Sequence, residues 1–129
     1  MIFFNKKSSS PVDFSLLGID IHSHLLPGID DGSPDIDTSL KLIGGLRELG
    51  FERLITTPHI MGDMYPNTPA IIGDRLSIVQ KMLAGKGMGI EFSAAAEYFL
   101  DDQMEQRIQN NEQLLTLSGN RVLCEFSML

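Results

Sequence analysis

Three histidines and two carboxylates stand at positions where their side chains could act together. His22 and His24 lie two residues apart after an apolar stretch, so on an extended chain they point to the same side. His59 and Glu97 each come after a later β-rich stretch, and Asp31 lies in the first loop. Taken singly, each histidine is better explained by a structural hydrogen bond than by metal binding. The combination predicts metal binding, and imidazole with carboxylate suits Mn, Fe or Zn better than Ca or Mg.

Three further polar residues near this set have two interpretations each. Asp20 shares the face of the first histidine pair, where it either fixes an imidazole tautomer or bonds only to the backbone. Glu125 on the last expected strand is assigned a structural role, with support of a ligand as the alternative. Cys124 lies in an apolar run and is expected to be a small buried side chain rather than a nucleophile.

The elements that must position these residues alternate between short β-rich stretches and helical ones. Apolar runs predict strands, and apolar residues at helical spacing predict the helices between them. The expected strands are 16–21, 53–57, 90–96 and 121–127, with a strand-like segment at 114–117. The expected helices are one capped by Ser33 or Asp37 and stopped by Gly50, one at about 69–84, and one at about 101–110 capped by Asp101 or Asp102.

This order is typical of an α/β fold with a parallel sheet built from right-handed βαβ units. In such folds catalytic residues collect at the carboxyl ends of the strands. Every histidine of the sequence and Glu97 are predicted to lie at that end. The candidate ligands are therefore expected to meet.

The bulk properties set limits on the class of protein. A chain of 129 residues is the size of one domain, which we place at 15–129 behind a flexible polar leader at 1–14. The net charge of −7 with scattered basic residues argues against nucleic acid and anionic membranes. A single cysteine excludes an intrachain disulfide. Neither a secretory signal nor a membrane-spanning run is recognised, so a cytoplasmic protein is expected.

Several of these stretches resemble the motifs of the polymerase and histidinol phosphatase (PHP) superfamily. Residues 19–24 with 30–32 are similar to its first motif, 57–59 to its second and 94–98 to its third. Residues 123–128 resemble the fourth strand of the bacterial tyrosine-protein phosphatases of capsule and exopolysaccharide operons, which also share the spacing of the first ligands. The resemblance covers about residues 18–129.

The resemblance implies the N-terminal half of a distorted (β/α)7 TIM-like barrel, with about four parallel strands alternating with three helices. It also implies up to three divalent metal ions, Mn first, with Fe or Zn as alternatives. His22, His24 and Glu97 would bind the first ion. Glu97 would bridge to a second ion that His59 also serves, and Asp31 would belong to a third. The implied reaction is hydrolysis of a phosphotyrosine protein, by analogy a tyrosine autokinase of polysaccharide export, with no covalent cysteine intermediate.

The departures from this family leave alternatives open. Its members continue with a further His, an Arg-bearing motif and a late Asp-x-His, whereas this sequence has only three histidines. A barrel of this type needs roughly 250 residues. The chain is accordingly also compatible with a non-catalytic fragment that retains partial ligands. A PHP phosphatase for histidinol phosphate or a nucleotide is a third hypothesis, and an amidohydrolase is less favoured because no Lys lies on these strands.

An unclosed sheet has a consequence for assembly. Half of a barrel leaves two unpaired edge strands and an interior face, on which Ile19, Ile55 and Phe92 are expected to be exposed. A homodimer or larger oligomer would cover this surface.

Overall fold

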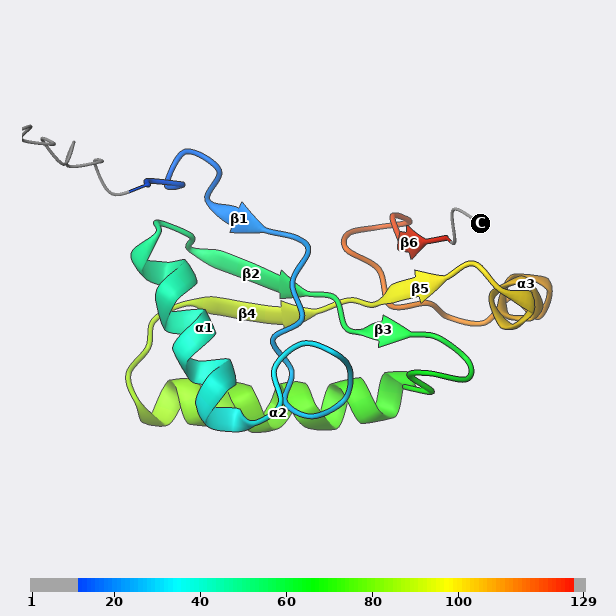
Figure 1. The fold of residues 1–129 in the computed structure, drawn as a ribbon. Helices are drawn as coiled ribbons and strands as arrows, with labels where there is room; N and C mark the ends of the chain where they lie inside the picture. Colours follow the sequence, from blue (N-terminus) through cyan, green and yellow to red (C-terminus); the bar gives the residue numbers. More distant parts are fainter. Residues whose placement is uncertain (1–11, 127–129) are drawn as a thin grey trace, which may run out of the picture.

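Parallel strands lie side by side in chain order, and two long helices pack beside them (Figure 1). The structure is a computed structural model that describes residues 12–126. Its elements are β1 (Ile19–Asp20), α1 (Ile36–Glu48), β2 (Arg53–Thr56), β3 (His59–Ile60), α2 (Pro69–Gly85), β4 (Glu91–Ala94), β5 (Glu97–Phe99), α3 (Asp102–Gln109) and β6 (Leu123–Glu125). The strands form two three-stranded sheets, ordered β1-β2-β4 and β3-β5-β6, and every pairing is parallel. The predicted α/β class, with parallel strands and three helices, is confirmed.

The second and third expected strands, 53–57 and 90–96, end early, at Thr56 and Ala94, and each is followed by a second short strand. Pro58 has no N–H to donate to a sheet, and the strand that ends at Thr56 resumes as β3 at His59. Ala95 and Ala96 lie between the end of β4 and the start of β5. His59 and Glu97 therefore begin new strands, whereas the sequence predicted that each would follow a finished one.

The broken strands nevertheless stay aligned with each other. The amide of Ala95 donates to the carbonyl of Thr56 at 2.9 Å, and the amide of Glu97 donates to that of Pro58 at 3.0 Å. Beyond the break, β3 pairs with β5 so that His59 is the register partner of Glu97. The two breaks thus place a histidine and a glutamate at the same level of neighbouring strands.

The N-cap of helix α1 lies two residues from each of the two expected caps. Its N-cap is Asp35, whose side chain accepts a hydrogen bond from the amide of Thr38 at 2.7 Å. Ser33 is buried instead, and its hydroxyl donates to the carbonyl of Asp35. Asp37 falls within the first turn. Gly50, with φ of 103°, adopts the left-handed conformation that stops the helix, as the sequence predicted.

The later elements follow the prediction less closely towards the end of the chain. Asp101 caps α3 as expected, accepting from the amide of Met104 at 2.9 Å. The strand-like segment predicted at 114–117 is irregular. The amide of Leu115 donates to the hydroxyl of Tyr98 at 2.8 Å, and the amide of Leu117 donates to the carbonyl of Arg121 at 2.8 Å. The last strand is shorter than expected, and its predicted end at Ser127 lies outside the described residues.

The hydrophobic core lies between the helices and the strands. Its buried side chains include Leu40 and Ile43 of α1, Ile72, Val79 and Leu83 of α2, and Leu54, Phe92 and Tyr98 of the strands. Residues on the expected leader also reach the packed region: the amide of Phe14 donates to the carbonyl of Leu49 at 2.7 Å, and its ring stacks on Phe51. Residues 1–11 of the leader expected at 1–14 lie outside the described residues.

The expected exposure of the inner sheet face is wrong. Ile55 and Phe92 are only 9% and 5% exposed, and Ile19 is half-buried. Exposed apolar side chains lie instead beside two of the four edge strands of the described sheets: Leu16, Leu17 and Ile21 near β1, and Leu100 and Phe126 near β6. None of the described helices combines the length and apolar character needed to cross a bilayer.

Candidate metal centre

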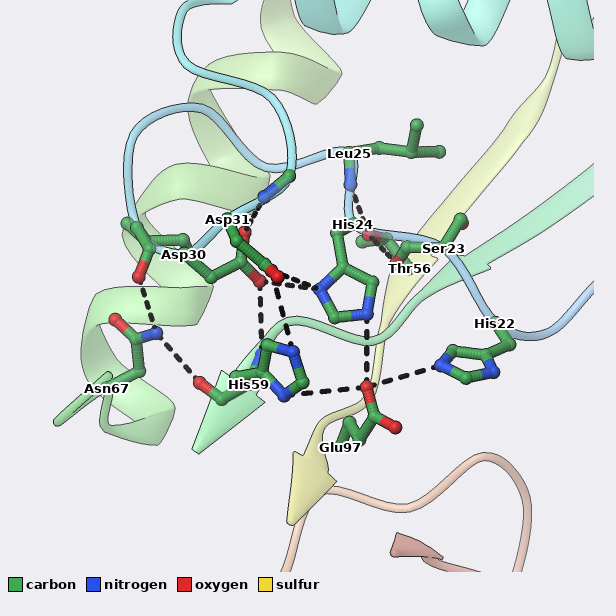
Figure 2. A network of polar contacts seen from close by, with 12 residues as sticks. His22, Ser23, His24, Leu25, Asp30, Asp31, Thr56, His59, Asn67 and Glu97 are labelled. Carbon is green, nitrogen blue, oxygen red and sulfur yellow. Dashed lines mark hydrogen bonds and ion pairs between the residues drawn. The ribbon is translucent and has the colours of Figure 1, made fainter. Parts of the chain in front are cut away.

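Three imidazole rings converge on one carboxylate oxygen (Figure 2). Glu97 Oε2 lies 3.2 Å from Nε2 of His22, 3.1 Å from Nε2 of His24 and 3.5 Å from Nδ1 of His59. The glutamate is buried, and its neighbours come from two other segments of the chain. The structure therefore brings together four of the five residues that the sequence selected, and Asp31 lies next to them.

The loop that carries His22 and His24 is fixed to the end of β2 by threonines. The carbonyl of Ser23 accepts from the amide of Thr57 at 2.7 Å and from the hydroxyl of Thr56 at 2.8 Å. The same Thr56 hydroxyl accepts from the amide of Leu25 at 2.9 Å. These bonds hold the loop after β1 against the neighbouring strand, so both histidines face the site.

Asp30, which the sequence analysis did not select as a site residue, is the central buried acceptor of this loop. Its carboxylate accepts from Nδ1 of His24 at 2.9 Å, from the amide of Gly32 at 3.0 Å and from the amide of His59 at 3.1 Å. Burial alone would raise the pKa of Asp30, but these hydrogen bonds outweigh it and hold the pKa below its usual range. The hydrogen bond to Asp30 is also the main reason why the pKa of His24 is raised.

Gly32 allows this loop to close tightly. A Cβ atom there would lie 2.3 Å from Cβ of His24, a distance that no side chain tolerates. The sequence Asp30-Asp31-Gly32 was the available signal for this arrangement, because an Asp followed two residues later by Gly commonly forms such a turn.

Asp31 and Glu125 extend the cluster in two directions. Asp31 Oδ1 lies 3.5 Å from Nε2 of His59 and 3.7 Å from Nδ1 of His24. Glu125 Oε2 lies 3.6 Å from Nδ1 of His59, so the residue expected to be structural faces the site from β6. Both carboxylates are largely exposed, at 61% and 45%, and form the open side of the cluster.

Asp20 does not make the imidazole contact that was one of its two expected roles. Its Oδ2 atom is buried without a hydrogen-bond partner among the described residues, and Asp30 holds the histidine tautomer instead. Cys124 is half-buried against the core, and burial raises the pKa of its thiol. A thiol that keeps its proton is a poor nucleophile, which agrees with the expected packing role.

The donor atoms fit divalent metal ions. Three groups each offer three ligand atoms within 4.8 Å of one another: His22, His24 and Glu97; His24, Asp31 and His59; and His59, Glu97 and Glu125. Ligands about 2.1 Å from one ion lie roughly 3.0–3.4 Å apart, close to the distances found here. Nδ1 of His59 is moreover buried with no hydrogen-bond partner among the described residues, which fits a nitrogen that coordinates a metal ion.

The fold and the donor set together define an α/β protein with a candidate metal centre at the junction of its parallel strands. The chain belongs to the family described as "Capsular polysaccharide synthesis, CpsB/CapC", whose sequence model matches residues 18–129. This finding confirms the resemblance to the capsule and exopolysaccharide phosphatases.

Two relatives of the chain are named as tyrosine-protein phosphatases. The chain is 30% identical over 109 residues to tyrosine-protein phosphatase YwqE of Bacillus subtilis, covering 84% of this chain and 42% of that protein. It is 29% identical over 111 residues to tyrosine-protein phosphatase CpsB of Streptococcus agalactiae, covering 85% and 45%.

A crystal structure matches the fold with a TM-score of 0.74 and 29% identity, over 84% of this chain and 44% of that one. It belongs to a study of YwqE from B. subtilis and CpsB from Streptococcus pneumoniae, described there as unique metal-dependent tyrosine phosphatases. The chain thus spans less than half the length of the relatives that it matches.

Proposed function

We propose that this chain supplies the metal-binding half of a metal-dependent protein-tyrosine phosphatase of capsule or exopolysaccharide synthesis. The observation that carries the proposal is the convergence of three imidazole nitrogens on Glu97 Oε2. The names of the relatives support the phosphotyrosine substrate, and the metal dependence described for the solved relatives supports the use of the cluster. A tyrosine autokinase is the proposed protein substrate, and the cytoplasm is the proposed location.

The proposed fold is the N-terminal half of a distorted (β/α)7 barrel, in which this site lies at the carboxyl ends of the strands. His22, His24 and Glu97 are the proposed ligands of a first ion, with Mn preferred over Fe and Zn. Glu97 would also serve a second ion together with His59, and Glu125 joins this second group because its carboxylate lies near His59. Asp31 would serve a third ion.

The residues of the chain prepare this site for phosphomonoester hydrolysis. Divalent ions held there supply polarisation of a phosphoryl group and activation of water. Asp30 keeps Nδ1 of His24 occupied, so Nε2 is the nitrogen that faces Glu97. Asp31 and Glu125 leave the site open on one side, where a substrate can enter.

A chimaera tests the proposed function. Residues 18–126 replace the matching part of YwqE from B. subtilis, and hydrolysis of a phosphotyrosine peptide is measured with added Mn²⁺. We expect turnover that Glu97→Gln abolishes. The isolated 129-residue chain is expected to hydrolyse the peptide very weakly or not at all, because it spans less than half of its relatives.

Two results of this experiment would contradict the proposal in different ways. A chimaera that melts cooperatively and binds Mn²⁺ but hydrolyses no phosphotyrosine peptide would refute the phosphatase function. Robust turnover by the isolated chain, lost in Glu97→Gln, would show that the chain needs no further half.

We also propose that the isolated chain forms a homodimer or larger oligomer through its sheet edges. Leu16 and Leu17 are exposed beside β1, an edge strand whose outer side is unpaired among the described residues. Light scattering should give a mass above the 14.3 kDa of one chain, and Leu17→Lys should shift the measured mass towards that of the monomer. Met64→Lys, an exposed apolar position away from β1, is the control. A monodisperse monomer of the unaltered chain would refute the proposal.

A further inference from the structure

We propose that Tyr65 is a positioning residue that sets the orientation of the His59 imidazole. The inference rests on the metal centre proposed above and assigns a role to a residue outside the cluster of ligands. Tyr65 is half-buried in the loop between β3 and α2, and its ring stacks on that of His59, with centroids 5.3 Å apart and an interplanar angle of 12°.

His59 needs such support because its ring lacks the usual hydrogen bond. A metal-binding histidine normally donates its second ring N–H to a carboxylate or carbonyl, which fixes the plane of the ring. His24 follows this rule through its bond to Asp30 at 2.9 Å. In His59, Nδ1 has no hydrogen-bond partner among the described residues, and Nε2 lies 3.5 Å from Asp31, beyond ordinary hydrogen-bond length.

Both nitrogens of His59 face carboxylates, so a rotation of the ring would affect two groups of candidate ligands at once. Nδ1 points towards Glu97 and Glu125, and Nε2 points towards Asp31. The stacked tyrosine limits rotation about the Cβ–Cγ bond, because turning the imidazole would drive its edge into the phenol ring. His24 adds a second limit, with its ring centroid 4.5 Å from that of His59.

Tyr65 is itself held in place by its loop. Its amide donates to the carbonyl of Met61 at 2.9 Å, and its carbonyl accepts from the amide of Met61 at 3.0 Å. Two residues later, the buried side-chain amide of Asn67 donates to the carbonyls of His59 at 2.8 Å and Ile29 at 2.9 Å (Figure 2). The loop therefore contacts His59 twice: Asn67 hydrogen-bonds its backbone carbonyl, and Tyr65 stacks on its ring.

The test compares four variants of the 129-residue chain: Tyr65→Leu, Tyr65→Phe, His59→Ala and, as a control in the same loop, Met64→Leu. Two quantities are measured: the affinity for Mn²⁺ alone, and the NMR shift of the His59 ring protons in the metal-free protein. We expect Tyr65→Leu to lower affinity by about 10-fold, the lower end of the loss seen when a ligand's supporting partner is removed. The upfield ring-current shift of His59 should disappear in Tyr65→Leu and persist in Tyr65→Phe and Met64→Leu.

The outcomes separate the inference from the function on which it rests. If Tyr65→Leu keeps the Mn²⁺ affinity of the unaltered chain while His59→Ala loses Mn²⁺, the positioning role is refuted and the metal centre stands. If His59→Ala itself binds Mn²⁺ as well as the unaltered chain, the proposed centre fails. Equal losses in Tyr65→Phe and Tyr65→Leu would show that the ring stack is not the cause.

Discussion

Glu97→Gln is expected to lower Mn²⁺ affinity by more than about 100-fold, beyond the roughly 10–100-fold loss that removal of a ligand's supporting partner produces. Glu97 Oε2 is the atom on which His22, His24 and His59 converge, and it belongs to two of the three groups of ligand atoms. Glutamine has nearly the same shape, so packing is preserved while the charge is lost. Calorimetric titration with Mn²⁺ and metal analysis of the purified protein measure the effect.

A matched variant shows whether the loss is specific to the site. Glu91 also begins a strand, but it is exposed and pairs only with Arg53 at the surface. Glu91→Gln should bind Mn²⁺ as the unaltered chain does. Full Mn²⁺ affinity in Glu97→Gln would show that Glu97 is not a ligand. Full affinity in the double variant His22→Ala with His24→Ala as well would refute the metal centre.

Asp30→Asn is expected to reduce both metal affinity and stability. Its side chain is 0% exposed and accepts three hydrogen bonds, one of which holds His24 and another the backbone of His59. Hydrogen bonds to a charged group contribute about 1.5–3 kcal/mol each, so loss of the charge should lower the free energy of unfolding by about 1–3 kcal/mol. The affinity for Mn²⁺ should fall by about 10–100-fold.

Asp31→Asn is the matched control, because it makes the same carboxylate-to-amide replacement at the neighbouring position. Asp31 is 61% exposed, so its substitution should leave the free energy of unfolding within about 0.5 kcal/mol of the unaltered chain while weakening Mn²⁺ binding. Urea unfolding of the metal-free proteins and Mn²⁺ titration separate the two effects. Equal stability of the two variants would mean that Asp30 does not support the loop.

The order of the elements and the main residues of the cluster could be predicted because both leave local signals in the sequence. Short β-rich runs alternate with helical spacing, and His22, His24, His59 and Glu97 each follow such a run. The sequence did not predict that a second strand would begin after Pro58 and after Ala95–Ala96. A proline signals an interruption of hydrogen bonding, but it does not say whether the chain continues in the same direction afterwards.

The supporting residues could not be predicted because their contacts are set by the tertiary fold. Asp30 bonds the amide of His59, 29 positions later, and Asn67 bonds the carbonyl of Ile29, 38 positions earlier. Neither contact leaves a periodic pattern. Asp20, which does share the face of the histidines in sequence, was a reasonable candidate for the support of an imidazole, but the turn at Asp30–Gly32 brings a closer carboxylate to His24.

The contact between His22 and Glu97 joins residues 75 positions apart, and its geometry depends on the pairing of strands in between. Such a contact contributes nothing until the intervening loops have closed, so we expect the cluster to form late in folding. An unfolded chain offers no comparable set of ligands. A cation bound by the cluster would therefore stabilise the native state relative to the denatured ensemble by mass action. The concentration of metal would then set the fraction of folded chain as well as the occupancy of the site.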